Sequence, residues 1–131
     1  MRHCACGVLI KDGCILLGKR PPERKLYPNA WDMIGGHQEA GETLDEILVR
    51  EFEEEIAVTP TEYREVTVLA EPRLAENGEG AYHVYAIDQW HSAGPHRCGD
   101  EHTALEWFTI DEALGLNLAV TEYRDVLTAM T

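Results

Sequence analysis

Residues 35–58 of the chain read GGHQEAGETLDEILVREFEEEIAV, a glycine-rich segment followed by the pattern of a helix. Thr43, with Glu46 three residues later, has the spacing of a capping box, which predicts that the helix begins here. Because Pro60 cannot continue a helix, the helix should end near Ile56. One face of it is apolar, through residues at helical spacing: Leu44, Ile47, Leu48 and Phe52.

The end of this helix carries four carboxylates in five positions, at Glu51, Glu53, Glu54 and Glu55. The helix dipole favours cations there, so each acid costs about 0.3–1 kcal/mol, and such a local conflict is typical of a functional site. Glu51, Glu54 and Glu55 share one helix edge, whereas Glu53 points elsewhere and should be solvated. Three carboxylates on one edge suit Mg²⁺ or Mn²⁺, although a solvated acidic face has the same pattern.

Gly35, Gly36 and Gly41 punctuate the segment before the helix, which we expect to be a loop that feeds the helix N-terminus. Glycines let a backbone approach a ligand closely. Such loops are common and indicate little alone. Joined at a fixed distance to the acidic helix, the loop favours a phosphate and metal site.

These residues resemble the 23-residue Nudix box, which would span residues 36–58, about a sixth of the chain. Ala57 is the one clear departure, because the pattern has glycine there, at a position that helps the chain leave the helix and carries no chemistry. The strand order and length of the flanking chain are also similar to the family. The positions in register are Gly36, Glu42, Arg50, Glu51, Phe52, Glu54, Glu55 and Val58.

The resemblance implies a hydrolase that cleaves a nucleoside diphosphate linked to another group, with Mg²⁺ or Mn²⁺ as cofactor. It implies that Glu54 and Glu55 are the principal metal ligands and that Glu51 is a ligand or the general base. The Gly35 carbonyl would be a further ligand, and Gly36 a structural position of the motif.

The resemblance also implies that Arg50 orients the glutamates, with Glu42 as its structural partner. Members of the family often carry one more acidic residue late in the chain, before a strand that contains Trp. Glu101 fits this place as a catalytic residue and metal ligand, ahead of Asp100 and Glu106, although a surface acid would look the same.

The rest of the chain predicts one domain over residues 1–131, of the α+β class. We expect a Nudix-type α/β/α sandwich around a mixed β-sheet. A second capping box, from Thr109 to Glu112, predicts a final helical region. The expected strands are residues 4–10, 14–17, 63–70, 81–89 and 105–110.

Composition excludes several classes of protein. The 131 residues are 44% hydrophobic, enough for a core, and no apolar run approaches the ~18 residues of a membrane span. With 11 basic and 24 acidic residues the net charge is −13, the wrong sign for a partner that is a nucleic acid polymer. We expect a cytoplasmic protein that contacts no membrane.

The four cysteines, Cys4, Cys6, Cys14 and Cys98, do not form the pattern of a disulfide framework. Zinc is an alternative at His3, Cys4 and Cys6, but no second cysteine pair faces them. Reduced cysteines buried in a strand are the favoured interpretation.

Several residues outside the motif are candidates for contact with substrate. Arg20, Arg24 and Lys25 precede the box and either bind outer phosphates or are simply solvated. Four aromatic residues either stack on a base or belong to the core: Trp31, Tyr82, Tyr85 and Trp107.

Small Nudix proteins of this length most often act on nucleotides, so the resemblance favours a nucleoside triphosphate or 8-oxo-dGTP as substrate. The enzymes that remove 8-oxo-dGTP usually have Phe-Pro where this chain has Met33-Ile34, which weighs against that substrate. ADP-ribose or a nucleotide sugar is the alternative. Residues 27–32 are similar to isopentenyl diphosphate isomerases, which are longer. A non-catalytic nucleotide sensor would have lost glutamates that are intact here. Dimers are common in the family, so a homodimer is also expected.

Overall fold

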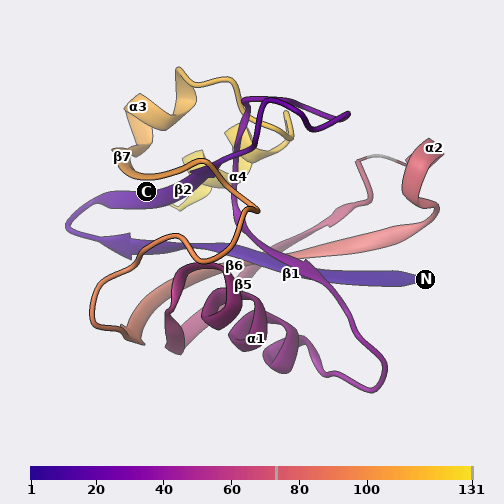
Figure 1. The fold of residues 1–131 in the computed structure, drawn as a ribbon, viewed down its shortest axis with the longest axis horizontal. Coiled ribbons are helices and arrows are strands. Elements are labelled where there is room, and N and C mark those ends of the chain that lie inside the picture. The colour runs from indigo at the N-terminus through magenta and orange to yellow at the C-terminus, as the bar shows by residue number, and fades with distance from the viewer. Residues whose placement is uncertain (73, 131) are drawn as a thin grey trace.

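The computed structural model describes residues 1–72 and 74–130, and it shows a mixed sheet between two layers of helices (Figure 1). Strand β1 (Arg2–Lys11) runs through the middle and pairs in parallel with β6 (Gly80–His91). Strand β5 (Thr59–Ala70) pairs antiparallel with β6 and forms the edge of the sheet. This confirms the α+β fold with a mixed sheet.

The other side of β1 has two neighbours. Its first half pairs antiparallel with β4 (Ile34–His37), and its end turns into β2 (Cys14–Lys19). Strand β2 pairs in turn with β3 (Trp31–Asp32) and β7 (Ala104–Thr109). The long strand β1 therefore joins two parts of the sheet, of which one contains β4, β5 and β6 and the other contains β2, β3 and β7.

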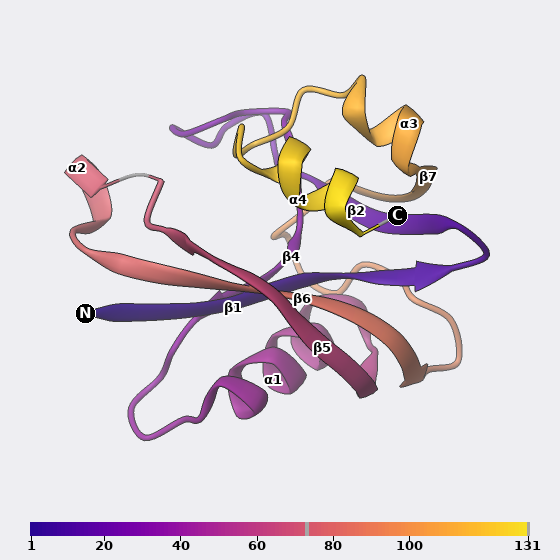
Figure 2. The ribbon, with the colours of Figure 1, turned by 180° about the vertical axis from the view of Figure 1, so that it is seen from behind.

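Helix α1 (Leu44–Ile56) covers one face of the sheet, and α3 (Ile110–Leu114) and α4 (Tyr123–Ala129) cover the other (Figure 2). Side chains of β1 alternate between two buried clusters, as the period of a strand requires. Ala5 and Leu9 pack with α1, and Cys4, Cys6 and Val8 pack with α4.

Helix α1 begins and ends as the sequence predicts. Thr43 accepts a hydrogen bond from the Glu46 N–H, the Glu46 side chain accepts one from Thr43 N–H, and the last helical residue is Ile56. Ala57 then adopts the left-handed conformation with φ 58°, while its N–H still donates to carbonyls of the last turn. Ala57 thus performs the turn for which the motif has glycine.

The glycine-rich segment is not the loop that we expected. Residues from Gly35 to His37 belong to strand β4, where they pair with Cys4–Cys6 of β1. At Gly35, φ is +154°, and a Cβ there would collide with the Ala5 carbonyl oxygen. The glycine therefore allows two strands to approach closely, and the loop proper covers residues 38–43.

Three other features of the secondary structure differ from the expectation. Strand β5 begins at Thr59 and includes Pro60, which an edge strand tolerates because it needs fewer N–H donors. A short helix, α2 (Leu74–Asn77), lies between β5 and β6, where only a turn was expected. The final helical region is two helices, α3 and α4, of which the Thr109 capping box begins the first.

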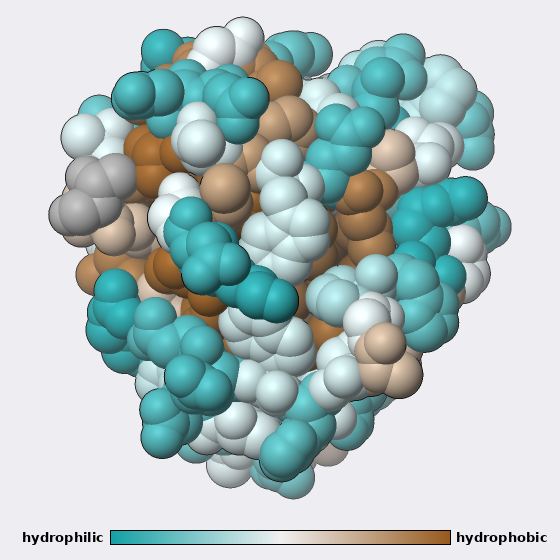
Figure 3. Space-filling model, turned by 90° about the vertical axis from the view of Figure 1, so that its left-hand side faces the viewer, coloured by the Kyte–Doolittle hydropathy of each residue, from teal (hydrophilic) through white to brown (hydrophobic). Residues whose placement is uncertain are grey.

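The state of the cysteines, the length of the helices and the polarity of the surface can be compared with the expectations from composition. Cys4 and Cys6 are buried and reduced, as expected, and Cys14 and Cys98 are half-buried and free. Within the described ranges, no helix has the length and apolar character to cross a membrane. Hydrophilic side chains cover most of the face seen in Figure 3, with apolar ones between them.

Candidate active site

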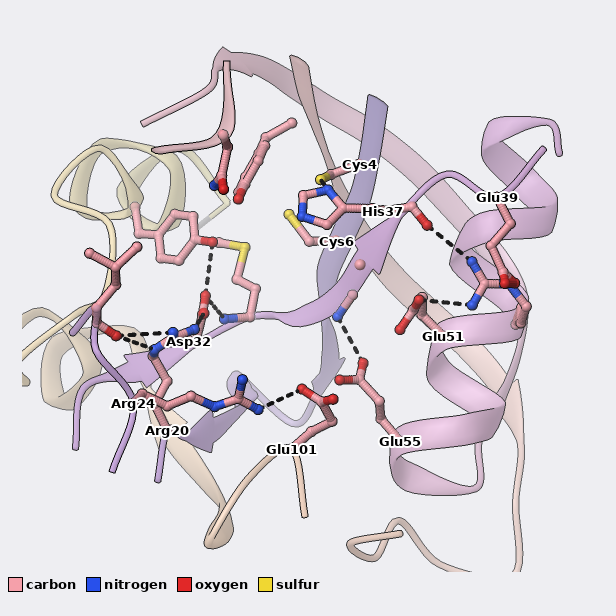
Figure 4. A pocket seen from close by; sticks show the side chains of 18 residues that line it. Cys4, Cys6, Arg20, Arg24, Asp32, His37, Glu39, Glu51, Glu55 and Glu101 are labelled. Carbon is pink, nitrogen blue, oxygen red and sulfur yellow. Dashed lines mark hydrogen bonds and ion pairs between the residues drawn. The ribbon is translucent and has the colours of Figure 1, made fainter. Parts of the chain in front are cut away.

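A cavity of about 560 Å³ opens between β1, β4 and α1 on one side and the segments 20–33 and 101 on the other (Figure 4). Its acidic end is formed by Glu51, Glu55 and Glu101. Aromatic and apolar side chains line the other part: Leu26, Met33, Tyr82 and Tyr123. The cavity thus combines a charged end with an apolar wall, and its volume is that of a ligand pocket.

Glu55 is the buried carboxylate of the acidic end, with 7% of its surface exposed. It accepts a hydrogen bond of 3.1 Å from the Gly35 N–H. Burial raises the pKa of Glu55 to about 9, and the charges of Glu51 and Glu101 raise it further while the Gly35 bond opposes them. Glu55 therefore holds a proton at neutral pH unless a cation replaces it.

Glu51 lies one helical turn before Glu55 and faces β4. A Cβ on Gly36 would overlap the Glu51 carboxylate, so the glycine makes the space that this carboxylate occupies. Burial raises the pKa of Glu51, and a 2.9 Å contact with Arg50 opposes that shift.

Arg50 connects the loop before α1 to the acidic edge. Its guanidinium donates to Glu42 at 2.6 and 2.9 Å, to Glu51 at 2.9 Å and to the His37 carbonyl at 3.1 Å. The pair lowers the pKa of Glu42 to about 2, chiefly through the Arg50 hydrogen bond and also through the Glu39 N–H. The contact expected between Arg50 and Glu42 is therefore present, and it holds the guanidinium beside Glu51.

Glu54 differs from its two partners on the edge. Its side chain is 59% exposed, contacts Arg50 at 3.3 Å and does not line the cavity. Glu53 points away, as expected, and accepts a hydrogen bond of 2.8 Å from the Thr59 hydroxyl. Within the described part of the chain, no three His, Cys, Asp or Glu side chains converge closely enough to hold a metal ion.

The donor set nevertheless fits a hard divalent cation. Glu51 and Glu55 present carboxylate oxygens to one cavity, and the negative charge of Glu51 disfavours the charged form of Glu55. A bound cation would offset this repulsion. Oxygen donors suit Mg²⁺ and Mn²⁺. Mg²⁺ usually completes its shell with waters and substrate phosphates, so a site that the protein closes only in part is compatible with it.

The three basic residues before the box have different positions. Arg24 lines the cavity and pairs with Glu101 at 3.0 Å across its mouth. Arg20 also lines it, but its guanidinium donates to the Leu26 carbonyl at 3.0 and 3.2 Å and to Asp32 at 3.2 Å. Arg20 therefore holds the loop, and Lys25 does not reach the cavity wall.

Sequence reasoning missed the pair of Asp32 and Tyr123. The Tyr123 hydroxyl donates to Asp32 at 2.9 Å, and the Met33 N–H donates to the same carboxylate oxygen at 2.8 Å. Both residues line the cavity, yet they lie 91 positions apart, and no local pattern joins them.

Of the four aromatic candidates, one lines the cavity and three pack elsewhere. Tyr82 lines the cavity, and Tyr85 is buried in the cluster under α1. Trp31 packs edge-on against Phe108, and Trp107 stacks on Trp90 outside the cavity.

Two buried thiols form the wall opposite the helix. Cys4 and Cys6 stand on the same face of β1, and the Cys4 sulfur is 2.6 Å from Nδ1 of His37. Burial raises the pKa of Cys4 to about 12, and also raises the pKa of Cys6, so both remain neutral thiols.

Comparisons with known proteins agree with this geometry. The NUDIX domain family model matches residues 1–130. Nucleoside triphosphatase NudI of Salmonella arizonae is 32% identical over 122 residues, which cover 85% of this chain and 84% of that protein.

Two solved structures are similar over nearly the whole chain. The MutT NUDIX hydrolase from Burkholderia pseudomallei has a TM-score of 0.86 and 27% identity, covering 99% of this chain and 98% of its own. The E. coli ORF135 protein has a TM-score of 0.81 and 27% identity, covering 99% of this chain and 88% of its own. The chain belongs to the Nudix family of pyrophosphohydrolases.

Proposed function

We propose that this protein hydrolyses nucleoside triphosphates to a nucleoside monophosphate and diphosphate, with 8-oxo-dGTP among its substrates. The observation that carries the proposal is the cavity, which is lined by the carboxylates of Glu51 and Glu55 and also by the aromatic rings of Tyr82 and Tyr123. A triphosphate with bound cations suits the carboxylates, and a base suits the aromatic rings. The similarity to NudI, a nucleoside triphosphatase, supports the same substrate class.

Glu51, Glu54, Glu55, Glu101 and the Gly35 carbonyl would hold Mg²⁺ or Mn²⁺ in this proposal. When bound, the metal would supply charge neutralisation of the phosphate oxygens and a more acidic water.

In this scheme the protein's own residues orient the general base and take the proton from the attacking water. Arg50 fixes the Glu51 carboxylate, which stands as the first candidate for the base, and Glu101 as the second. Water adds to one phosphorus, its proton passes to the carboxylate, and the bridging P–O bond breaks to release diphosphate. Arg24, released from Glu101, would pair with the outer phosphates, and Arg20 would hold the loop that presents it.

The test is a Mg²⁺-dependent turnover panel with separate detection of diphosphate and monophosphate products. It includes ordinary and oxidised nucleoside triphosphates, ADP-ribose, nucleotide sugars and isopentenyl diphosphate. We expect diphosphate from a triphosphate, complete loss on addition of EDTA, and loss in Glu54→Gln. Reaction in ¹⁸O-labelled water identifies the phosphorus that is attacked, because the label enters the product that contains it.

Each other outcome of the panel contradicts the proposal in a recognisable way. Cleavage of ADP-ribose or a nucleotide sugar alone would establish the alternative substrate class. Conversion of isopentenyl diphosphate without phosphate release would indicate an isomerase. Nucleotide binding without Mg²⁺ and without turnover would indicate a sensor. The cytoplasmic location and the homodimer stay predictions.

A further inference from the structure

A chain of polar side chains crosses three strands on the face of the sheet that also carries α1. His3 on β1 and His83 on β6 approach each other, with Nδ1 of His3 3.1 Å from Nε2 of His83. The other ring nitrogen of His83, Nδ1, contacts the Glu65 carboxylate of β5 at 3.3 Å. The Tyr85 hydroxyl donates to the same oxygen at 3.4 Å.

The register of the sheet produces this arrangement. Ala5 stands opposite His83 in the parallel pair of β1 and β6, so His3 is the diagonal neighbour of His83 on the same face. Glu65 stands opposite Tyr85 across β5 and β6, which brings its carboxylate near His83. The two imidazole rings are tilted by 36° with centroids 5.3 Å apart, so the nitrogens and not the ring faces make the contact.

The contacts also assign the tautomers. Because Nδ1–H of His83 donates to Glu65, Nε2 of His83 carries a lone pair and accepts from Nδ1–H of His3. A metal-ligating histidine typically has this polarity, in which one nitrogen faces the metal and the other donates to a carboxylate.

We propose that His3 and His83 form a second metal site, which binds a transition-metal ion such as Zn²⁺ between Nδ1 of His3 and Nε2 of His83, with Glu65 orienting His83. The Nδ1 proton of His3 moves to its own Nε2 when the metal binds, so both imidazoles ligate as neutral rings. Two imidazole nitrogens at 2.0–2.1 Å from a tetrahedral ion are about 3.3 Å apart, close to the observed 3.1 Å. Waters complete the coordination, since the structure places two nitrogen ligands there and both histidines are only half-buried.

Ligand chemistry separates this site from the acidic cavity. Imidazole suits Zn²⁺, Cu²⁺ and Ni²⁺, whereas carboxylate and carbonyl oxygens suit Mg²⁺ and Mn²⁺. The net charge of −13 raises the concentration of divalent cations near the whole chain. The site thus goes beyond the proposed function and does not depend on it.

The position of the site gives it a structural consequence. The His3 carbonyl accepts a hydrogen bond of 2.8 Å from the Gln38 N–H, and the Gln38 side chain donates to the Glu42 carbonyl at 2.8 Å. A metal held by His3 and His83 would therefore cross-link β1 to β6 beside the loop that positions Glu42 against Arg50.

The experiment is calorimetric titration of the whole protein with Zn²⁺ in the presence of excess Mg²⁺, which occupies the oxygen site. We expect one Zn²⁺ per chain, and an affinity at least tenfold lower in His3→Ala and in His83→Ala. Glu65→Gln should lower the affinity by about 10–100-fold, as loss of an outer carboxylate does. His96→Ala, which removes an exposed histidine elsewhere, should leave it unchanged.

His37→Ala is the second control, because the Cys4 sulfur and the His37 imidazole in the cavity form another pair of groups that a soft metal could bind. Its Zn²⁺ affinity should equal that of the wild type. Zn²⁺ should also raise the unfolding temperature of the wild type and not that of His3→Ala, by mass action on the folded state. His3→Ala keeps the test decisive if His83→Ala does not fold.

The proposal is overturned if the wild type binds no Zn²⁺ under these conditions. It is equally overturned if binding survives in His3→Ala, or if His37→Ala rather than His3→Ala removes it. EPR of the Cu²⁺-loaded protein gives an independent check, since two imidazole nitrogens should couple to the copper and one or none would contradict the assignment.

Discussion

The Gly35 backbone N–H donates a 3.1 Å hydrogen bond to the Glu55 carboxylate and thereby ties β4 to the last turn of α1. This bond draws an acidic side chain into a site where burial raises its pKa to about 9. A backbone donor is the main group in the structure that favours the charged form, because Arg50 is already engaged by Glu42 and Glu51. Glu55 is consequently the residue whose ionisation should depend most on a bound cation.

Glu55 should make the metal-free protein less stable as the pH rises. Its pKa is about 9 in the folded protein and 4.5 as an ordinary carboxyl, so between these values the folded state holds one more proton than the unfolded state. The free energy of unfolding therefore falls from about pH 4.5 to about pH 9. Glu55→Gln cannot ionise and should lose this slope, which urea unfolding in EDTA at several pH values would measure. An identical slope in the variant would contradict the assignment.

Glu54→Gln should abolish turnover and leave the fold intact. We expect kcat to fall at least ~100-fold, since Glu54 is a metal ligand in the proposed function and its loss would remove several kcal/mol of transition-state stabilisation. Its side chain is 59% exposed and stands in an acidic edge, so the stability should be unchanged or slightly higher. Glu53→Gln, one position away and facing Thr59, is the matched control and should retain full kcat. Equal loss in both variants would refute a specific role for Glu54.

Gly36→Ala should lower activity because its Cβ would displace the Glu51 carboxylate. The displaced atoms belong to a flexible side chain, so the protein should still fold, and we expect at least a tenfold loss of kcat. Gly41→Ala is the control, since φ at Gly41 is +81° and no atom lies near its Cβ. That variant should lose about 1–2 kcal/mol of stability with little change in kcat. Activity assays and urea unfolding of the two variants should therefore give opposite patterns.

Ala57→Gly should stabilise the protein. Ala57 holds φ 58°, a left-handed conformation that costs a non-glycine residue about 1 kcal/mol or more and costs glycine little. We expect the free energy of unfolding in urea to rise by roughly 1 kcal/mol, with kcat unchanged. A large rise in kcat would show instead that the departure from the motif affects the chemistry.

Arg24→Ala should raise KM for a triphosphate several-fold, because Arg24 lines the cavity and, in the proposed function, leaves its partner Glu101 to pair with the outer phosphates. Stability should change by less than about 1 kcal/mol, as expected for an exposed ion pair. Lys25→Ala, beside it but outside the cavity wall, should leave KM within about twofold of the wild type. Steady-state kinetics at fixed Mg²⁺ compares the two, and equal KM values would remove Arg24 from the phosphate site.

Local patterns in the sequence predicted α1 from Thr43 to Ile56, and the same spacing placed Glu51 and Glu55 on one edge. They succeeded because a capping box and a helical apolar face involve residues at most four positions apart. The exposed position of Glu54 was not predictable in this way, since its contact with Arg50 depends on how the side chain turns.

The sequence by itself thus determined the family, helix α1, its acidic edge and the excess of negative charge. Tertiary structure alone decided that Gly35 pairs in β4 with Cys6, that Tyr123 meets Asp32 across 91 residues, and that His3 approaches His83. The physical reason is the range of the interactions. Helix caps and helical periodicity are read within a few residues, whereas strand register and cavity walls depend on which distant segments the core brings together.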